Sequence, residues 1–240
     1  MSVMSVSILI LIWQACGFLN VLPQYILPTP LEIMQSIFRD YAYLLYHGQF
    51  TLFVALLGLL LGVMIAVVLS LIMDSVPLFQ KAIYPFLVMT QTIPTIALAP
   101  ILVLWLGYGM LPKIVLIVMT TTFPIVISIL DGFRQADKDT LMLFQLMRAT
   151  KQQTLVHFKI PATLPYFFAG LRVSVSYAFI SAVVSEWLGG FEGLGVYMIR
   201  AKKIFQYDTM FAIIIIVSII SLLSMKAVEQ LEKRVITWRR

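Results

Sequence analysis

Few residues of this chain are of the types that do catalytic chemistry, and their spacing does not bring them together. The two histidines, His47 and His157, fall in loops expected on opposite sides of the molecule, so they cannot share a metal ion with each other or with a cysteine partner. A phosphate-binding G-x-x-x-x-G-K-[ST] loop and a G-x-S-x-G nucleophile motif are both absent. The sequence therefore predicts no catalytic residues, no metal site and no bound cofactor in this chain, and favours a conduit over an enzyme.

Polar residues inside long apolar runs are the remaining candidates for chemistry. Glu186 lies near the end of the run 167–188, where an ionisable group in a membrane is costly and usually functional. A hydrogen-bonded anchor at the membrane surface is the alternative. The run 82–106 holds a polar stretch interrupted by prolines, which indicates either a broken span at a transport site or a simple proline kink. The candidates for a translocation path are Thr90, Gln91, Thr92, Pro94, Thr95, Ser174, Ser181, Ser185 and Glu186.

The composition requires elements that cross a lipid bilayer. The chain is 61% hydrophobic and 12% charged, with a mean hydropathy of +0.98, whereas a soluble domain is about half apolar and a quarter charged. We therefore predict an all-α integral membrane protein with a single transmembrane domain over residues 1–240. About 20 apolar residues span the hydrocarbon core. The runs predict about six spans, at 3–19, 50–73, 82–106, 111–130, 167–188 and 209–227.

The distribution of positive charge predicts the orientation of these spans. The first run lacks the basic start and small-residue cleavage site of a signal peptide, so we expect it to be retained. With both termini inside, twelve of the 17 lysines and arginines fall on the inner side, as the positive-inside rule requires. The net charge of +6 thus reflects topology and does not indicate nucleic-acid binding.

Small residues recur at four-residue spacing in two of the runs. This spacing allows helix backbones to approach closely in lipid, where packing replaces the hydrophobic effect. Tight helix packing is the favoured interpretation, and a stripe facing a water-filled path is the alternative. The residues predicted to pack helices are Gly58, Gly62, Ala66, Ser70, Gly170 and Ala178.

The segment 131–165 is polar and basic between two apolar runs, and the topology makes it the longest cytoplasmic loop. Its first part, "ADKDTLMLFQLMR", predicts a helix capped by Asp137 or Asp139. Thr150 and Gln153 then fit the T-x-x-Q spacing of a capping box, which predicts a second helix from 151 to about 158.

That second helix is expected to be short. It must end before Pro161, because a residue that precedes proline is disfavoured in the helical region. A helix of two turns is unstable alone. We therefore expect a groove on a partner protein to complete it, the alternative being packing along the chain's own inner surface.

Several segments, in order, resemble the membrane permeases of bacterial binding-protein-dependent ABC importers. "RATKQQTLVHFKIPATLPYFFAGLRVSVSYAF" is similar to that family's coupling loop, in which a glycine and a long spacer precede a hydrophobic-x-[LI]-P ending. "ILPTPLEI", "QTIPTIALAPILVLWLGYG", "FPIVISILDGF" and "VVSEWLGGFEGLGVYMI" resemble the branch that handles nitrate, sulfonates, taurine and thiamine pyrimidine precursors. The resemblance runs from about residue 27 to the end of the chain and is closest to the pyrimidine-precursor permeases.

The coupling loop departs from the family pattern at two places. Arg148 stands where the pattern has glycine, and Met142, Leu143 and Phe144 stand where it has glutamate, alanine and alanine. Glycine permits a positive φ or a sharp bend. With Arg148 in its place, we expect the bend to be made differently or at a neighbouring residue.

The resemblance implies a fold, partners and a location. It implies the type I ABC importer permease fold, with a coupling helix between spans four and five, in the bacterial cytoplasmic membrane. It also implies a homodimeric second copy, a cytoplasmic subunit that binds ATP and Mg²⁺, and an extracytoplasmic substrate-binding protein. An ion-coupled secondary transporter and a non-transporting membrane scaffold are the alternatives. The residues implied to contact the ATPase are Arg148, Ala149, Thr150, Lys151, Gln152, Gln153, Leu155, Val156, His157, Phe158 and Pro161.

Overall fold

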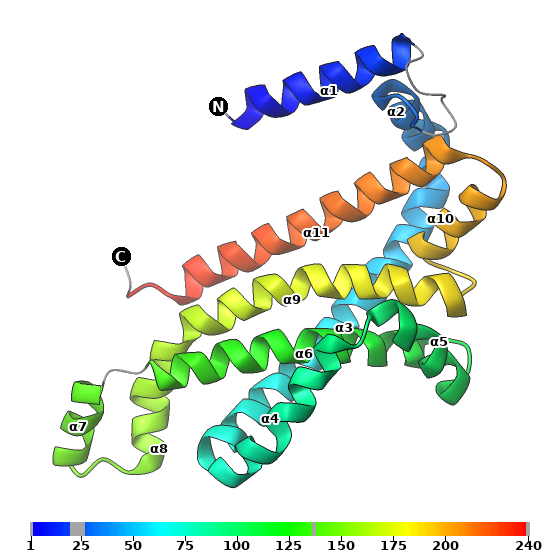
Figure 1. The fold of residues 1–240 in the computed structure, drawn as a ribbon. Helices are drawn as coiled ribbons and strands as arrows, with labels where there is room; N and C mark the ends of the chain where they lie inside the picture. The colour runs from blue at the N-terminus through cyan, green and yellow to red at the C-terminus, as the bar shows by residue number, and fades with distance from the viewer. Residues whose placement is uncertain (1, 20–26, 136–137, 239–240) are drawn as a thin grey trace.

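The computed structural model describes residues 2–19, 27–135 and 138–238, and all regular elements in these ranges are helices. Figure 1 shows their arrangement. In chain order they are α1 (Ser2–Phe18), α2 (Pro30–Arg39), α3 (Tyr41–Ser75), α4 (Pro77–Thr92), α5 (Thr95–Leu106), α6 (Met110–Arg134), α7 (Lys138–Leu146), α8 (Lys151–Thr154), the π-helical turn η1 (Leu155–Lys159), α9 (Ile160–Gly189), α10 (Leu194–Lys203) and α11 (Tyr207–Val235).

Four of the predicted spans correspond to helices that are long and apolar enough to cross a membrane. These are α3, α6, α11 and the helical stretch from Lys151 to Leu188, which includes α9. The pair α4 and α5 makes a fifth crossing if it is counted as one broken span. At 17 residues α1 is shorter than these helices, so the count of six stays a prediction.

The run 82–106 is broken, and the simple proline kink is the wrong interpretation of it. The axes of α4 and α5 differ by 104° across the break between Thr92 and Thr95. Ile93 has φ −82° and ψ 123°, because the ring of Pro94 disfavours the helical region at the preceding residue. By contrast, α6 continues as one helix through Pro124.

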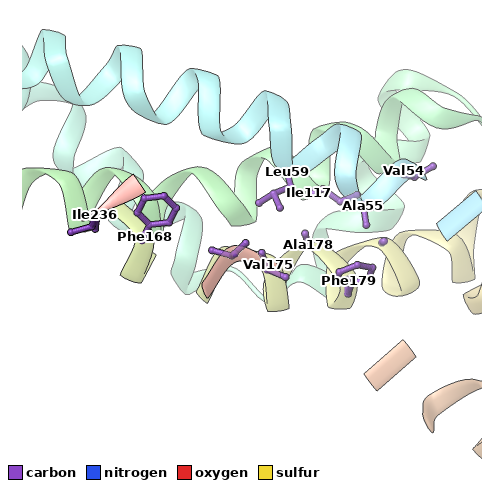
Figure 2. Packing of buried hydrophobic residues seen from close by; sticks show 11 residues of the cluster. Val54, Ala55, Leu59, Ile117, Phe168, Val175, Ala178, Phe179 and Ile236 are labelled. Atoms are coloured by element: carbon purple, nitrogen blue, oxygen red, sulfur yellow. The ribbon is translucent and has the colours of Figure 1, made fainter. Parts of the chain in front are cut away.

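The core lies where α3, α6 and α9 meet, and the predicted small residues lie in these contacts. A Cβ atom on Gly58 would come within 2.6 Å of Ile117 Cγ2, and one on Gly170 within 2.7 Å of Ser128 Oγ. Ala66 and Ser70 are fully buried. Larger apolar side chains from the three helices fill the space beside them (Figure 2). Small residues thus bring the backbones together, and dispersion contacts hold them there.

The two ends of this bundle differ in Figure 1. The start of α1, the end of α11 and the hairpin of α7 and α8 lie at one end, and α2 and α10 lie at the other. The start of α1 and the end of α11 are therefore on the side of the predicted coupling loop. We call this end the inner end and the opposite one the outer end, following the predicted topology.

Candidate functional site

The hairpin formed by α7, α8 and η1, residues 138–159, projects from the inner end of the bundle (Figure 1). Asp139 lies within the first turn of α7 and so is not its cap, whereas Asp137, the other predicted cap, lies outside the described residues. Where α7 ends, the chain reverses at Arg148, whose φ is +55°. Of the two expectations, a bend made differently or one made at a neighbouring residue, the second is therefore wrong.

Two backbone hydrogen bonds explain why Arg148 adopts a left-handed conformation. Its N–H donates to the carbonyl of Gln145, and the N–H of Ala149 donates to the carbonyl of Phe144, each at 2.9 Å. This is the Schellman closure of a helix end, in which glycine normally occupies the left-handed position. The hydrogen bonds offset a conformational cost of about 1–2 kcal/mol for a residue with a Cβ.

The next helix begins with the predicted capping box. Thr150 Oγ1 accepts from the N–H of Gln153 at 3.2 Å, and the N–H of Thr150 donates to Gln153 Oε1 at 2.8 Å. A cap of this kind contributes about 1 kcal/mol. The prediction from the T-x-x-Q spacing is confirmed.

The prediction that this helix ends before Pro161 is wrong. Ile160 is helical, with φ −61° and ψ −52°, and its N–H donates to the carbonyl of Leu155, five residues back. An α-helical turn would place the proline ring against the carbonyl of residue 157. The wider π turn shifts that carbonyl, so that helical backbone continues into α9. Single π turns of this type occur often at functional sites.

Some side chains of the hairpin pack within the chain, and others are exposed to solvent. The rings of Phe144 and Phe158 stack with their centroids 5.6 Å apart, which ties α7 to η1, and Leu155 packs against the buried cluster between α3 and α6. These two candidate contacts, Leu155 and Phe158, are therefore half-buried by packing within the chain. The exposed apolar side chains of the hairpin are Met142, Leu143, Leu146, Met147 and Val156.

Sequence reasoning missed most of this exposed apolar surface. Of its five residues, only Val156 was among the candidates for ATPase contact. Met142 and Leu143 were noted as departures from the family pattern, and Leu146 and Met147 were passed over. The signal was available, since apolar residues gather on a short helix that is outside every predicted span. The polar candidates Arg148, Thr150, Lys151, Gln152, Gln153 and His157 are exposed, and Ala149 and Pro161 are half-buried.

At the outer end, Glu186 is buried and binds neighbouring helices. Its carboxylate accepts from Thr51 Oγ1 of α3 at 2.9 Å and from the N–H of Gly195 at 2.7 Å. Thr51 Oγ1 in turn accepts from the N–H of Leu194 at 2.8 Å. These amides are the first of α10, which lack partners within their own helix. Glu186 and Thr51 therefore cap α10 from two other helices.

His47 completes this cap, and its predicted position in an outer loop is wrong. It lies within α3, is buried, and its Nδ1 accepts from the N–H of Gly193 at 3.0 Å. Gly193 has φ +117°, and a Cβ there would collide with the Glu186 carboxylate. The glycine is required both for its backbone conformation and for the close approach of the acid. Glu186 thus makes the hydrogen bonds expected of an anchor.

The serines proposed for a path lie within the bundle, between α9 and its neighbours. Ser174 Oγ donates to the carbonyl of Thr121 at 2.8 Å, and the hydroxyls of Ser181 and Thr120 are 2.9 Å apart. Ser185 Oγ donates to a carbonyl of its own helix. All three serines are buried, with at most 4% of their surface exposed.

The remaining path candidates gather at the break between α4 and α5. The hydroxyls of Thr90 and Thr92 donate to carbonyls of their own helix, and Thr95 begins α5. The side-chain nitrogen of Gln91 is buried without a hydrogen-bond partner. The structure therefore separates the predicted path residues into three places: this break, the α6–α9 contact and the cap of α10.

A second polar cluster joins α2, α3 and α11 at the outer end. Arg39 Nη2 lies 3.0 Å from Asp40 and 3.1 Å from Asp208, and Thr209 Oγ1 donates to Asp40 at 3.0 Å. Burial opposes ionisation of Asp40, but the hydrogen bonds from Arg39 and Thr209 outweigh it and lower the pKa of this carboxyl. Burial raises the pKa of Tyr197 beside it to about 12.

Comparison with known proteins gives both a family and individual relatives. Residues 58–237 match the family described as binding-protein-dependent transport system inner membrane component. The chain is 40% identical over 217 residues to a probable ABC transporter permease protein of Haemophilus influenzae, covering 90% of this chain and 89% of that protein. It is 38% identical over 233 residues to the formylaminopyrimidine transport permease protein ThiX of Halalkalibacterium halodurans, covering 97% and 93%. It is 30% identical over 236 residues to the putative aliphatic sulfonates transport permease protein SsuC of Bacillus subtilis, covering 97% and 85%.

Solved structures match the fold. A chain of an amino acid ABC transporter crystallised with histidines superposes with a TM-score of 0.70 at 15% identity, covering 83% of this chain and 97% of that one. At this identity the match bears on the fold alone. It agrees with the predicted all-helical permease architecture.

Proposed function

We propose that this chain, which belongs to the family of binding-protein-dependent transport system inner membrane components and is an ABC importer permease, is driven through its 138–159 hairpin. Two copies form the translocation path, and an extracytoplasmic binding protein delivers the solute. A cytoplasmic subunit binds ATP and Mg²⁺ and holds the hairpin in a cleft. Closure of two such subunits on ATP then moves the membrane helices between inward-open and outward-open states.

The observation that carries this proposal is the construction of the hairpin. A Schellman closure at Arg148 and a capping box at Thr150 fix its turn, and the Phe144–Phe158 stack joins its two arms. The hairpin lies outside the predicted membrane spans, yet it carries apolar side chains that are exposed. Met147 is 79% exposed and Leu146 is 71% exposed. Apolar surface of this kind on a short helix is suited to docking in a groove on a partner.

For the solute, we favour a pyrimidine precursor of thiamine. The 38% identity to a formylaminopyrimidine permease over nearly the whole chain supports this choice. An aliphatic sulfonate is the second candidate, supported by the relative at 30% identity. The two differ in charge, so the cognate binding protein must discriminate between a neutral heterocycle and an anion.

Reconstitution tests the mechanism. The chain is placed in proteoliposomes with its ATP-binding subunit and binding protein, and uptake is measured with and without ATP. We expect uptake only with ATP and both partners. Uptake driven by an ion gradient without ATP would indicate a secondary transporter, and assembly without uptake would indicate a scaffold.

Replacing residues 150–158 by a flexible linker of equal length tests the hairpin itself. We expect membrane insertion to persist and ATP hydrolysis to become independent of uptake. Unchanged uptake by this variant would contradict the proposal. Thermal stabilisation of the binding protein by pyrimidines, sulfonates or nitrate tests the solute separately, and stabilisation by sulfonates alone would overturn the choice of a pyrimidine.

A further inference from the structure

Lys159 connects the hairpin to two helices of the bundle at once. Its ammonium donates to both carboxylate oxygens of Asp74, at 3.1 and 2.8 Å. The same nitrogen lies 5.6 Å from the ring centroid of Phe133. Asp74 is in the last turn of α3, and Phe133 is buried near the end of α6. One cation therefore joins η1 to α3 and α6.

The surroundings of this contact distinguish it from an ordinary surface ion pair. The side chains of Lys159 and Asp74 are 24% and 23% exposed, whereas those of the pair Lys233–Glu229 on α11 are 68% and 47% exposed. Exposed pairs contribute little, because water and salt screen them. A half-buried ammonium that contacts both oxygens of a carboxylate and an aromatic face is held more firmly.

Side-chain packing around this contact leaves space between the helices. A cavity of about 180 Å³ is lined by residues of α3, α6 and α9, which include Leu71, Thr163 and Phe133, the ring that Lys159 faces. The hydroxyl of Thr163 is buried there without a hydrogen-bond partner. The hairpin follows α6 and precedes α9, so the chain itself joins it to both helices, whereas α3 must be reached through side chains.

We propose that Lys159 is the positioning residue that makes α3 move with the hairpin, together with α6 and α9. Through Asp74 and Phe133 it holds the end of the π turn, so that force on residues 150–158 shifts three helices together. Without this contact, movement of the hairpin reaches α3 less directly, through the packing of Leu155 and through α6 and α9. This inference rests on the proposed function, because it concerns how ATP-driven movement of the hairpin reaches the path.

The test compares solute transported per ATP hydrolysed in reconstituted, fully assembled complexes. For Lys159→Met and Asp74→Asn we expect this ratio to fall about fivefold, the factor that corresponds to roughly 1 kcal/mol. The charge-swapped variant Asp74→Lys with Lys159→Asp should recover part of the loss. The matched control Lys233→Met removes an ion pair that lies within one helix, and it should leave the ratio unchanged.

A second measurement separates this inference from the proposed function. Spin labels are attached at residues 75 and 151 after Cys16, the single cysteine, has been replaced by serine. We expect a narrow distance distribution in the otherwise unchanged chain and a broad one in Lys159→Met. Equal widths, or an unchanged transport ratio in Lys159→Met and Asp74→Asn, would overturn the role of Lys159. Absence of ATP-driven uptake by the unmodified complex would instead refute the proposed function.

Discussion

Replacing Arg148 by glycine should stabilise the turn of the hairpin. Arg148 has φ +55°, a conformation that costs a residue with a Cβ about 1–2 kcal/mol. Glycine avoids this cost, but it loses about 0.5–1 kcal/mol more than alanine in conformational entropy on folding. The net expected gain from Arg148→Gly is therefore about 1 kcal/mol, which is roughly a fivefold decrease in the local opening constant.

Hydrogen exchange at residues 148 and 149 measures this opening directly. Their N–H groups donate to the carbonyls of Gln145 and Phe144, so both exchange only when the Schellman closure opens. After correction for intrinsic rates, both amides should exchange about fivefold more slowly in Arg148→Gly. Met147→Gly is the matched control, because glycine at a position with negative φ should accelerate exchange by a similar factor.

The same pair of variants can refute the reasoning. If Arg148→Gly left exchange unchanged or made it faster while Met147→Gly behaved as expected, Arg148 would not occupy a strained left-handed conformation in the protein. Arg148→Val gives a further comparison, since a β-branched residue is still less compatible with positive φ. The turn of the hairpin should open more readily in Arg148→Val than in the unmodified chain.

Three further predictions concern the packing and the polar clusters. Glu186→Ala removes the acceptor for the start of α10 and should lower the local stability there by about 1–3 kcal/mol. This loss should be measured as faster hydrogen exchange of the amides of residues 193–195. Thr51→Val should produce a smaller change in the same amides. The pKa of Asp40 in the folded protein lies below its ordinary value of 3.8. The ionised Asp40 therefore stabilises the fold fully at a pH above 3.8, and this stabilisation is lost as the pH falls through the folded pKa. Asp40→Asn should therefore flatten the decrease in Tm below about pH 4, and an equal slope in both proteins would contradict this role. Gly58→Ala places a methyl group against Ile117 and should cost about 1–3 kcal/mol, measured as a lower Tm that the second change Ile117→Ala restores in part.

Features that depend on neighbouring residues in the sequence could be predicted. The apolar runs that became α3, α6, α9 and α11 needed only composition and length, because lipid imposes both. The capping box at Thr150 needed only two side chains three residues apart. The break at Pro94 was one of two interpretations of a local pattern, and the choice between them depended on how α4 and α5 pack, which the sequence alone did not determine.

Features that depend on distant partners could not be predicted. Glu186 looked ambiguous because its partners, Thr51 and Gly195, come from other helices, and a single acid in an apolar run gives no sign of them. His47 was placed in a loop because the apolar run begins at residue 50, whereas α3 begins at Tyr41 and buries His47 against Gly193. Helices extend beyond the hydrocarbon, so hydropathy underestimates their length at the outer end.

Arg148 and Pro161 show why local rules failed within the hairpin. Each rule describes a preference of about 1 to a few kcal/mol, and hydrogen bonds of similar strength can reverse it. At Arg148 two backbone hydrogen bonds retain the left-handed bend that the family pattern assigns to glycine. At Pro161 a π turn retains a continuous helix that proline would otherwise end. In both places the backbone follows a path that the residue disfavours, as the proposed docking of a hairpin of fixed geometry on a partner would require.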